Sequence, residues 1–178
     1  MIRRGDVPTL YSEATLDQFA AKTRDVLRQW LEQPEGLVTI TGRPGSGKTH
    51  CAWAVVREYQ REHDGARFEL STAFLLDVAA WVGAYGMGGA VPALKQAARF
   101  PGLFVLDDLG AEKLTDFGQQ SLIYLLTERE QWRRPTLVTS NLSLSEVSGR
   151  LDARIASRLA GGLVLVMQRD RRVKAQGG

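Results

Sequence analysis

One stretch of the sequence has the spacing of a phosphate-binding loop. Residues 42–49 read G-R-P-G-S-G-K-T, which matches the pattern G-x-x-x-x-G-K-[ST]. An apolar run at 37–40 precedes the loop, and a run typical of a helix, 48–62, follows it. Glycines allow the tight turn in which backbone N–H groups point at phosphates, and the helix N-terminus adds positive potential there. This context favours a phosphate site over a chance glycine turn that opens a helix.

The loop residues are suited to holding ATP together with Mg²⁺. Lys48 would reach the β- and γ-phosphates, and the hydroxyl of Thr49 would bind the metal ion. For the nearby Cys51 and Trp53 we expect only core packing. The predicted nucleotide-binding residues are Arg43, Pro44, Gly45, Ser46, Gly47, Lys48, Thr49 and His50.

Two adjacent acids, Asp107 and Asp108, follow an apolar run at 103–106. A run without polar alternation predicts a central parallel strand that is covered on both faces. Asp107 would hold Mg²⁺, directly or through a water, and Asp108 would orient the attacking water. Two acids at the end of a buried strand are costly without a cation, so they favour a metal over a solvated acidic loop. Because aspartate is shorter than the glutamate more often found in this role, we expect slow hydrolysis or help from Glu112.

A third polar strand end is Asn141, which follows a strand expected at 136–140. Its amide would contact the γ-phosphate or the attacking water, although Asn is also common in ordinary turns. In a parallel α/β sheet, ligands sit at the carboxyl ends of the strands. Because the phosphate loop, the paired acids and Asn141 each end a different strand, we expect them to meet in one ATP-hydrolysing site.

Two arginines, Arg154 and Arg158, are spaced to share one face of a helix. If this helix lies at the edge of the domain, they cannot easily reach the phosphates bound by their own chain. Arg154 could instead reach the nucleotide of a neighbouring subunit, where such arginines accelerate hydrolysis by roughly 10³–10⁵. The alternative is a solvated basic face on which Asp152 is a weak local partner.

The elements that must position these residues alternate between strands and helices, which predicts an α/β fold with a parallel sheet covered on both faces. A glycine-rich stretch, 83–89, is expected to form a flexible loop between two helices. Strands are expected at 37–40, 67–71, 103–108, 136–140 and 163–167. Helices are expected at 16–30, 48–62, 72–82, 92–99, 116–132 and 152–159, with a short one after Ser143.

Composition indicates one ordinary globular domain rather than a membrane protein. The chain has 178 residues, of which 44% are hydrophobic and 24% are charged, and no apolar run is long enough to span a membrane. No secretory signal follows Met1, and the single Cys51 excludes a disulfide within the chain, which favours the cytoplasm. The net charge of +3 lies wholly in the tail after Gln168, so any DNA-binding surface depends on local clusters.

Together these motifs resemble the AAA+ ATPases, and among them the DnaC/IstB-like helicase-loader family. The likeness lies in the phosphate loop, in L-D-D-L-G at 106–110, in R-P-T…T-S-N at 134–141 and in R-I-A-S-R-L at 154–159. It covers nearly the whole chain and implies a P-loop NTPase fold of three α/β/α layers, with a parallel five-stranded sheet in the order 5-1-4-3-2. It also implies that Asn141 senses the γ-phosphate, that Arg154 acts in trans and that Arg158 supports it.

The resemblance implies ATP-dependent self-association on single-stranded DNA and delivery of a replicative helicase. DNA contacts are expected from Arg99, Arg133, Arg134 and the basic tail. An IstB-type ATPase helper of DNA transposition is the sibling alternative, and a small-molecule kinase with the same phosphate loop is a more distant one. Because Asp108 is short for its role, an ATP-gated adaptor that does not hydrolyse ATP is a further alternative.

Three parts are expected along the chain: an N-terminal arm and helix at 1–35, an AAA+ ATPase core at 36–168 and a basic tail at 169–178. The first part is short for the helicase-binding region that loaders carry, so we expect either a fragment or a compact variant. No helical lid domain is expected after the last strand. Arg171 or Arg172 could replace the arginine that such a lid supplies, although a solvated tail is the simpler interpretation.

Overall fold

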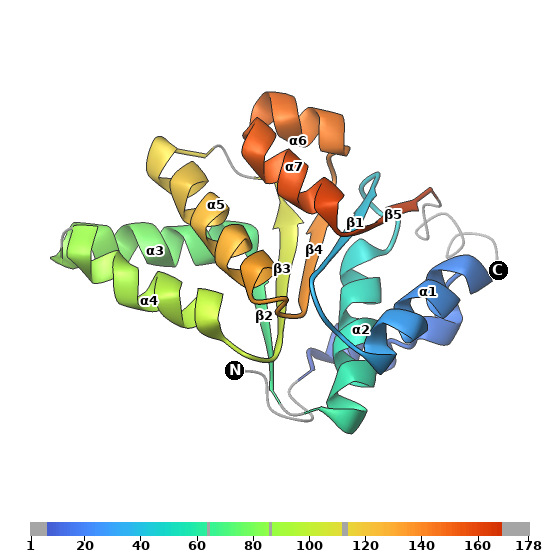
Figure 1. The fold of residues 1–178 in the computed structure, drawn as a ribbon. Coiled ribbons are helices and arrows are strands. Elements are labelled where there is room, and N and C mark those ends of the chain that lie inside the picture. Colours follow the sequence, from blue (N-terminus) through green and yellow to red (C-terminus); the bar gives the residue numbers. More distant parts are fainter. Residues whose placement is uncertain (1–6, 64, 86, 112–113, 169–178) are drawn as a thin grey trace.

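The computed structural model describes residues 7–63, 65–85, 87–111 and 114–168 (Figure 1). Its centre is a parallel five-stranded sheet in the order β2-β3-β4-β1-β5, which is the predicted order read from the other edge. Helices lie on both faces, so the predicted three-layer α/β/α fold is confirmed. The strands are β1 (Leu37–Gly42), β2 (Ala66–Leu70), β3 (Leu103–Leu109), β4 (Thr136–Ser140) and β5 (Leu163–Met167).

The helices divide unequally between the two faces of the sheet (Figure 1). On one face lie α1 (Ala21–Glu32) and α2 (Lys48–Glu62), preceded by two short 3₁₀ helices, η1 (Thr9–Tyr11) and η2 (Leu16–Gln18). No described helix follows β5, and none is long and apolar enough to cross a membrane. The other face carries α3 (Ser71–Tyr85), α4 (Met87–Arg99), α5 (Asp116–Gln131), α6 (Leu144–Arg150) and α7 (Ala153–Gly161).

Alternate residues of the central strand β3 enter two separate hydrophobic cores. In β3, Phe104 and Leu106 face the layer that contains α5, whereas Leu103 and Val105 face α1 and α2. All four side chains are fully buried. Because helices cover the sheet on both sides, a central strand must be apolar at every position, which explains the unbroken apolar run that leads to Asp107.

The parallel sheet brings the polar strand ends to one edge. β1 lies between β4 and β5, with Thr41 opposite Ser140 and Gly42 opposite Met167. On its other side β4 pairs with β3, so β3, β4 and β1 are consecutive in the sheet. The paired acids therefore lie near the end of β3, and Asn141 and the phosphate loop follow the neighbouring strands β4 and β1.

The glycine-rich stretch at 83–89 is mostly helical, so the prediction of a flexible loop there was wrong. α3 continues to Tyr85 and α4 begins at Met87, which places Pro92 inside a helix rather than at its start. A glycine costs a helix only about 1 kcal/mol relative to alanine. The packing of α3 and α4 against each other offsets such a cost, and local propensity contains no information about that packing.

The N-terminal helix is shorter than its apolar spacing predicts. Residues 16–18 form η2, and α1 begins only at Ala21, after an extended backbone at Phe19. Leu16 and Phe19 are nevertheless buried in the same core as Leu27 of α1. The chain therefore bends between η2 and α1 while its apolar residues stay on the inside.

A buried arginine, Arg129 of α5, organises the edge at which the strands begin. Its side chain is fully buried and forms no ion pair with the described residues, but it donates five hydrogen bonds to neutral oxygens. Burial lowers the pKa of this guanidinium to about 9, so it stays charged at neutral pH. The acceptors, at 2.7–3.0 Å, are the carbonyl oxygens of Ala97, Phe100, Gly102 and Pro135 and Oγ1 of Thr136.

Replacing Arg129 with methionine keeps much of its volume but leaves five acceptors without their donor. Because each buried polar group that loses its partner costs about 1–3 kcal/mol, we expect Arg129→Met to lower the free energy of unfolding by at least about 3 kcal/mol in denaturant titrations. The control Arg150→Ala changes an exposed arginine of α6 and should shift this free energy by less than about 0.5 kcal/mol. Equal unfolding midpoints for Arg129→Met and the unchanged chain would contradict the role of this residue.

Candidate nucleotide-binding site

The phosphate loop depends on glycine at three positions. Gly45 and Gly47 have φ of 81° and 93°, in the left-handed region that other residues rarely adopt. At Gly42, φ is 152° and a Cβ would lie 2.2 Å from the carbonyl oxygen of Met167 in β5. The loop therefore turns tightly against β5, and α2 begins at Lys48 directly after it.

The ammonium of Lys48 is held at the mouth of this loop. Its Nζ donates to the carbonyl oxygens of Gly42 at 2.9 Å and Arg43 at 3.0 Å, and it lies 3.4 Å from Oγ of Ser46. The lysine is 6% exposed, and Ser46 is buried beside it. Arg43 and Ser46 thus contact Lys48 rather than line the cavity described below, whereas the other predicted loop residues line it.

A buried carboxylate, that of Asp107, lies directly against the start of α2. Oγ1 of Thr49 donates to Oδ2 of Asp107 at 2.9 Å, and Oγ1 of Thr139 donates to Oδ1 at 2.6 Å. Burial raises the pKa of Asp107, and the charge of Asp108 adds to the rise. The two hydroxyl hydrogen bonds and the charge of Lys48 act in the opposite direction. The hydroxyl and carboxylate that the sequence predicted to hold Mg²⁺ are therefore neighbours.

The donor atoms at this position fit Mg²⁺. Thr49 and Asp107 offer oxygen ligands beside the phosphate loop, and Mg²⁺ is usually held by one or two carboxylates together with phosphates and waters. The described residues contain no group of three or more His, Cys, Asp or Glu that could enclose a metal ion. The arrangement suits a cation that arrives with a nucleotide rather than one caged by protein.

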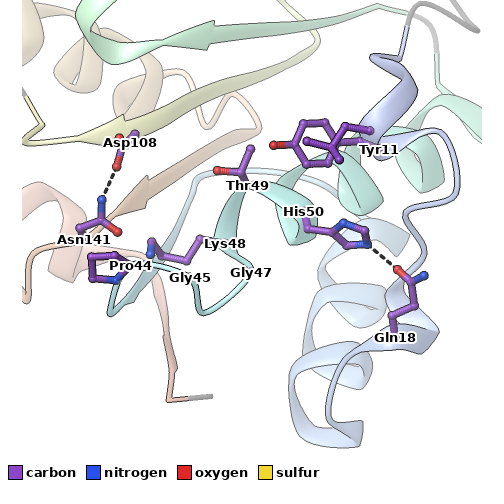
Figure 2. Close-up of a pocket in the computed structure, with 11 residues that line it drawn as sticks. Tyr11, Gln18, Pro44, Gly45, Gly47, Lys48, Thr49, His50, Asp108 and Asn141 are labelled. Carbon is purple, nitrogen blue, oxygen red and sulfur yellow. Dashed lines mark hydrogen bonds between the residues drawn. The ribbon is translucent and has the colours of Figure 1, made fainter. Parts of the chain in front are cut away.

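The second acid, Asp108, is turned away from the first by a break in the sheet. The pairing of β3 with β4 shifts register between Leu106 and Leu109, and Asp108 has a φ of 61°. Its N–H donates to Oγ1 of Thr139 at 2.9 Å, and Nδ2 of Asn141 donates to its Oδ1 at 2.5 Å (Figure 2). The bulge thus directs Asp107 to Thr49 and Asp108 to Asn141.

The residues after the acids lock β3 to β4. Oγ of Ser140 donates to the carbonyl oxygen of Leu109 at 2.6 Å and accepts the N–H of Leu142 at 3.1 Å. Gly110 has a φ of 90°, and a Cβ there would lie 2.5 Å from Cδ1 of Leu142. Hydrogen bonds therefore join the segment L-D-D-L-G at the end of β3 to the segment T-S-N at the end of β4.

A cavity of about 630 Å³ opens over these strand ends (Figure 2). Asp108 and Asn141 lie at one end of the row of loop residues, and Tyr11, His50 and Gln18 lie at the other. Nε2 of His50 is 2.5 Å from Oε1 of Gln18, and the Tyr11 ring meets the His50 ring edge-on. The lining residues are Leu10, Tyr11, Gln18, Pro44, Gly45, Gly47, Lys48, Thr49, His50, Asp108 and Asn141.

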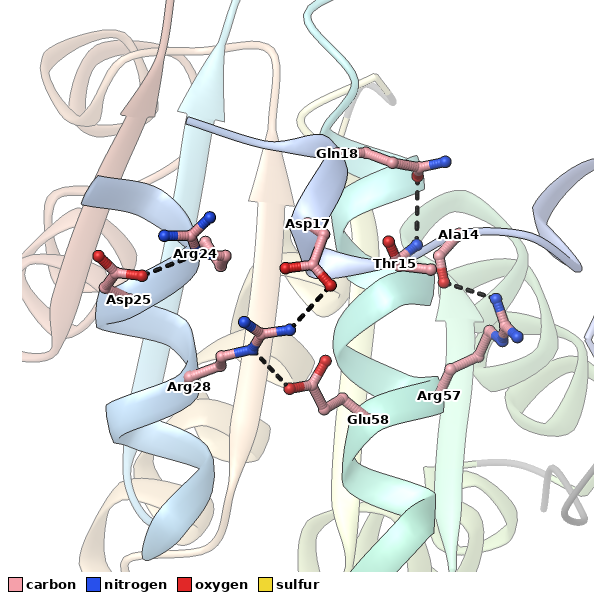
Figure 3. A network of polar contacts seen from close by, with 9 residues as sticks. All are labelled: Ala14, Thr15, Asp17, Gln18, Arg24, Asp25, Arg28, Arg57 and Glu58. Carbon is pink, nitrogen blue, oxygen red and sulfur yellow. Dashed lines mark hydrogen bonds and ion pairs between the residues drawn. The ribbon is translucent and has the colours of Figure 1, made fainter. Parts of the chain in front are cut away.

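A polar network fixes the N-terminal segment that supplies part of this lining (Figure 3). Arg28 of α1 bridges Asp17 of η2 at 3.1 Å and Glu58 of α2 at 2.9 Å. Nη1 of Arg57 donates to the carbonyl oxygen of Ala14 at 2.6 Å. Because Gln18 belongs to the same short helix as Asp17, the network sets the position of Gln18 beside α2. The sequence prediction of an N-terminal arm and helix at 1–35 did not include a contribution of this segment to the cavity.

Arg154, which is expected to act in trans, and Arg158, its expected supporting partner, lie away from this cavity. Arg154 is exposed and donates two side-chain hydrogen bonds to Asp152, at 3.1 and 3.0 Å. Asp152 also caps α7 by accepting the N–H of Arg154 at 2.7 Å. Arg158 pairs with Glu130 at 2.7 Å, and both arginines line a separate pocket of about 330 Å³. Each arginine is therefore held by a carboxylate of its own chain.

The residues expected to contact DNA lie at the opposite edge of the sheet. Arg99 ends α4 shortly before β3, and Arg133 and Arg134 lie between α5 and β4. Arg133 forms an ion pair with Glu35, and Nη1 of Arg134 donates to the carbonyl oxygen of Ala98 at 2.6 Å. Glu112, Arg171, Arg172 and the rest of the tail lie outside the described residues.

Two relatives with known names match part of the chain. DnaA, the chromosomal replication initiator protein of Sphingopyxis alaskensis, is 33% identical over 122 residues, which are 67% of this chain and 26% of that protein. An ATP-binding protein in an insertion sequence of Mycobacterium tuberculosis is 27% identical over 113 residues, which are 64% of this chain and 43% of that protein. The chain thus spans less than half the length of either relative.

Solved structures share the fold over most of the chain. The DnaC helicase loader has a TM-score of 0.76 at 24% identity and covers 90% of this chain and 99% of its own. DnaI has a TM-score of 0.75 at 19% identity, with 91% and 94% covered. DnaA bound to AMPPCP and single-stranded DNA has a TM-score of 0.78 at 18% identity, with 92% and 52% covered.

The match to a protein family covers the site and almost all of the fold. The family model of IstB-like ATP-binding proteins matches residues 12–164, from the N-terminal segment at the cavity to β5. That range includes the phosphate loop, both acids, Asn141 and Arg154. The chain belongs to the family of IstB-like ATP-binding proteins.

Proposed function

We propose that this chain is an AAA+ ATPase that uses ATP to load a replicative helicase onto single-stranded DNA. The observation that carries the proposal is the meeting of three strand ends around one cavity. The phosphate loop follows β1, Asp107 lies near the end of β3, and Asn141 follows β4. These groups match the parts that phosphoryl-transfer sites need: a phosphate cradle, a metal ligand and a residue that orients water.

In this proposal the residues around the phosphates act through position and charge. Lys48 and the loop N–H groups would bind the phosphates, and Thr49 and Asp107 would hold Mg²⁺. When bound, the ion neutralises negative charge on the phosphate oxygens. Asp108 would orient the attacking water. Hydrogen bonds of Asp108 with Asn141 and Thr139 fix the direction of this carboxylate. An aspartate fixed in this way supports hydrolysis, although its shorter reach is compatible with a slow rate.

The far end of the cavity is suited to the base and ribose of the nucleotide. Tyr11 and His50 offer ring surfaces there, and the amide of Gln18, which bonds to Thr15 and Glu13, lies against His50. The cavity, at about 630 Å³, lies within the range of small-ligand sites, roughly 300–1,000 Å³. The N-terminal segment therefore belongs to the proposed ATP site, joined to α2 by Arg28 and Arg57.

We further propose that ATP joins subunits through Arg154. Its exposed side chain lies outside the cavity of its own chain, so it is available to the nucleotide of a neighbour. Asp152 holds the guanidinium in the free subunit, and a γ-phosphate with more negative charge would replace that carboxylate. In this proposal, exchange of one anion for another would make assembly depend on ATP rather than on ADP.

Two observations bear on the choice of partner. DnaC and DnaI share the fold over nearly their whole described chains, which favours a helicase loader. The family model and the relative from an insertion sequence favour the alternative, an ATPase helper of DNA transposition. Both functions require ATP-dependent assembly on DNA, whereas a small-molecule kinase does not.

Light scattering tests the proposed function directly. The mass of the chain in solution would be measured with and without a slowly hydrolysed ATP analogue, and with and without single-stranded DNA. We expect the mass to increase only when nucleotide is present and to increase further with DNA. A mass equal to that of one chain under all four conditions would contradict ATP-dependent assembly. Helicase unwinding on a protein-coated template then separates a loader from a transposition helper.

Lys48→Ala should remove ATP binding without unfolding the chain. The lysine supplies a charge-assisted contact worth about 1.5–3 kcal/mol, so we expect the dissociation constant for ATP to increase at least about tenfold in a calorimetric titration. Lys95→Ala, which changes an exposed lysine of α4, is the matched control and should bind like the unchanged chain. Tight ATP binding by Lys48→Ala would contradict the proposal that the phosphate loop binds ATP.

Arg154→Ala should bind ATP normally but lose most of its DNA-stimulated hydrolysis, by up to about 10³-fold. Mixing provides the test of action in trans, because a Lys48→Ala subunit keeps Arg154 but binds no ATP. An equimolar mixture of Arg154→Ala and Lys48→Ala should therefore recover activity that neither variant has alone. Full activity of Arg154→Ala by itself, or no recovery in the mixture, would contradict the assignment.

A further inference from the structure

An exposed tryptophan and a guanidinium form a flat surface at the edge where the strands begin. Trp132, the residue after α5, is 65% exposed, although large aromatic side chains are normally well buried. The Cζ atom of Arg134 lies 5.7 Å from the centre of its ring, within the range of a cation–π contact. One ring face is thus supported by an arginine while much of the indole remains in contact with solvent.

Several arginines gather at this edge, and only some of them have a carboxylate partner: Arg67 pairs with Glu69 and Arg133 pairs with Glu35. Guanidinium Cζ atoms of Arg67 and Arg129 lie 5.7 and 5.0 Å from the ring centre of Phe104. Burial and the nearby charge of Arg134 both lower the pKa of Arg129. Among the described residues, Arg129 and Arg134 bond to neutral oxygens and form no ion pair. An anion bound at this surface would reduce the repulsion between the positive charges of Arg129 and Arg134.

The surface is held in shape before any partner binds. Arg133 has a φ of 47°, and its carbonyl oxygen accepts the N–H of Gly36 at 3.0 Å. The N–H of Arg134 donates to the carbonyl oxygen of Arg129 at 2.8 Å. The side chain of Arg134 reaches the carbonyl oxygen of Ala98, next to the exposed Arg99. The two ends of α4 and α5 are therefore joined, and little ordering is required on binding.

We propose that Trp132, Arg134, Arg133 and Arg99, here named the amino-edge surface, bind single-stranded DNA by stacking one base on Trp132 and holding adjacent phosphates with the arginines. This inference rests on the proposed function, because it supplies the DNA contact that a loader needs. The surface lies at the opposite edge of the sheet from the phosphate loop, so DNA and ATP do not compete for space.

The chemistry of the surface favours a single strand over other anions. An unpaired base presents a free π-face to an aromatic side chain, whereas the bases of a duplex are already stacked on each other. An acidic peptide would use the arginines but would gain little from the indole. The pairing of Arg133 with Glu35 is exposed, so a phosphate can replace that carboxylate.

Fluorescence anisotropy with a labelled oligothymidylate measures this contact on the full chain. A base that stacks on an aromatic side chain loses this contact when the ring is removed. We therefore expect Trp132→Ala to weaken the affinity for the oligonucleotide roughly 5- to 150-fold. Trp132→Phe, which keeps an aromatic face, should recover most of the affinity. Arg134→Ala should weaken binding and reduce the salt dependence of log K by about 0.7, the value for one phosphate contact on a single strand. Arg150→Ala is the matched control at an exposed arginine of α6, and ATP binding should be unchanged in every variant.

Several outcomes would overturn the inference. If the unchanged chain binds the oligonucleotide and both Trp132→Ala and Arg134→Ala bind it equally well, DNA binds elsewhere and the proposed function stands. If Trp132→Ala weakens duplex and single-stranded DNA to the same extent, base stacking is wrong. If the unchanged chain binds no single-stranded DNA with or without ATP, this surface and the DNA partner of the proposed function are both wrong. Loss of binding in Trp132→Ala with recovery in Trp132→Phe supports the inference.

Discussion

The hydrogen-bonded carboxylate of Asp107 is the contact on which the rest of the site depends. Thr49 from α2 and Thr139 from β4 both donate to it, so the phosphate loop, β3 and β4 meet at one buried charge. Burial opposes that charge, and the hydroxyl hydrogen bonds offset the penalty only in part. A divalent cation bound with a triphosphate would offset the rest of the penalty for burying the charge of Asp107. The same Thr139 hydroxyl accepts the N–H of Asp108, so one residue orients both acids.

The two edges of the sheet differ in how their polar groups are used. At the carboxyl edge, glycines and a bulge leave backbone and polar side chains accessible around a cavity. At the amino edge, Arg129 satisfies the carbonyl oxygens where α4 ends and where β3 and β4 begin. A rigid amino edge fixes the spacing of β3 and β4, and therefore the spacing of the groups that those strands present at the other edge. The charge of Arg129 also contributes to the potential of the amino-edge surface.

Local pattern was enough to predict some of this arrangement and not the rest. The phosphate loop, the buried strand before Asp107 and the short helix after Ser143 follow from spacing within a few residues. Thr139 appears in the sequence as one more strand residue, and its role depends on a partner far away in the chain. Gln18 and Arg129 were missed for the same reason. The helices at 83–89 were missed because tertiary packing outweighs the low helix propensity of glycine.

The central claim is that three adjacent strand ends close around one magnesium triphosphate. A crystal structure of the chain with Mg²⁺ and a slowly hydrolysed ATP analogue tests it most directly. The account predicts the metal ion between Oγ1 of Thr49 and the Asp107 carboxylate, with the γ-phosphate facing Asp108 and Asn141 and the base beside Tyr11 and His50. A triphosphate bound elsewhere, or a metal ion with no contact to Thr49 or Asp107, would contradict it.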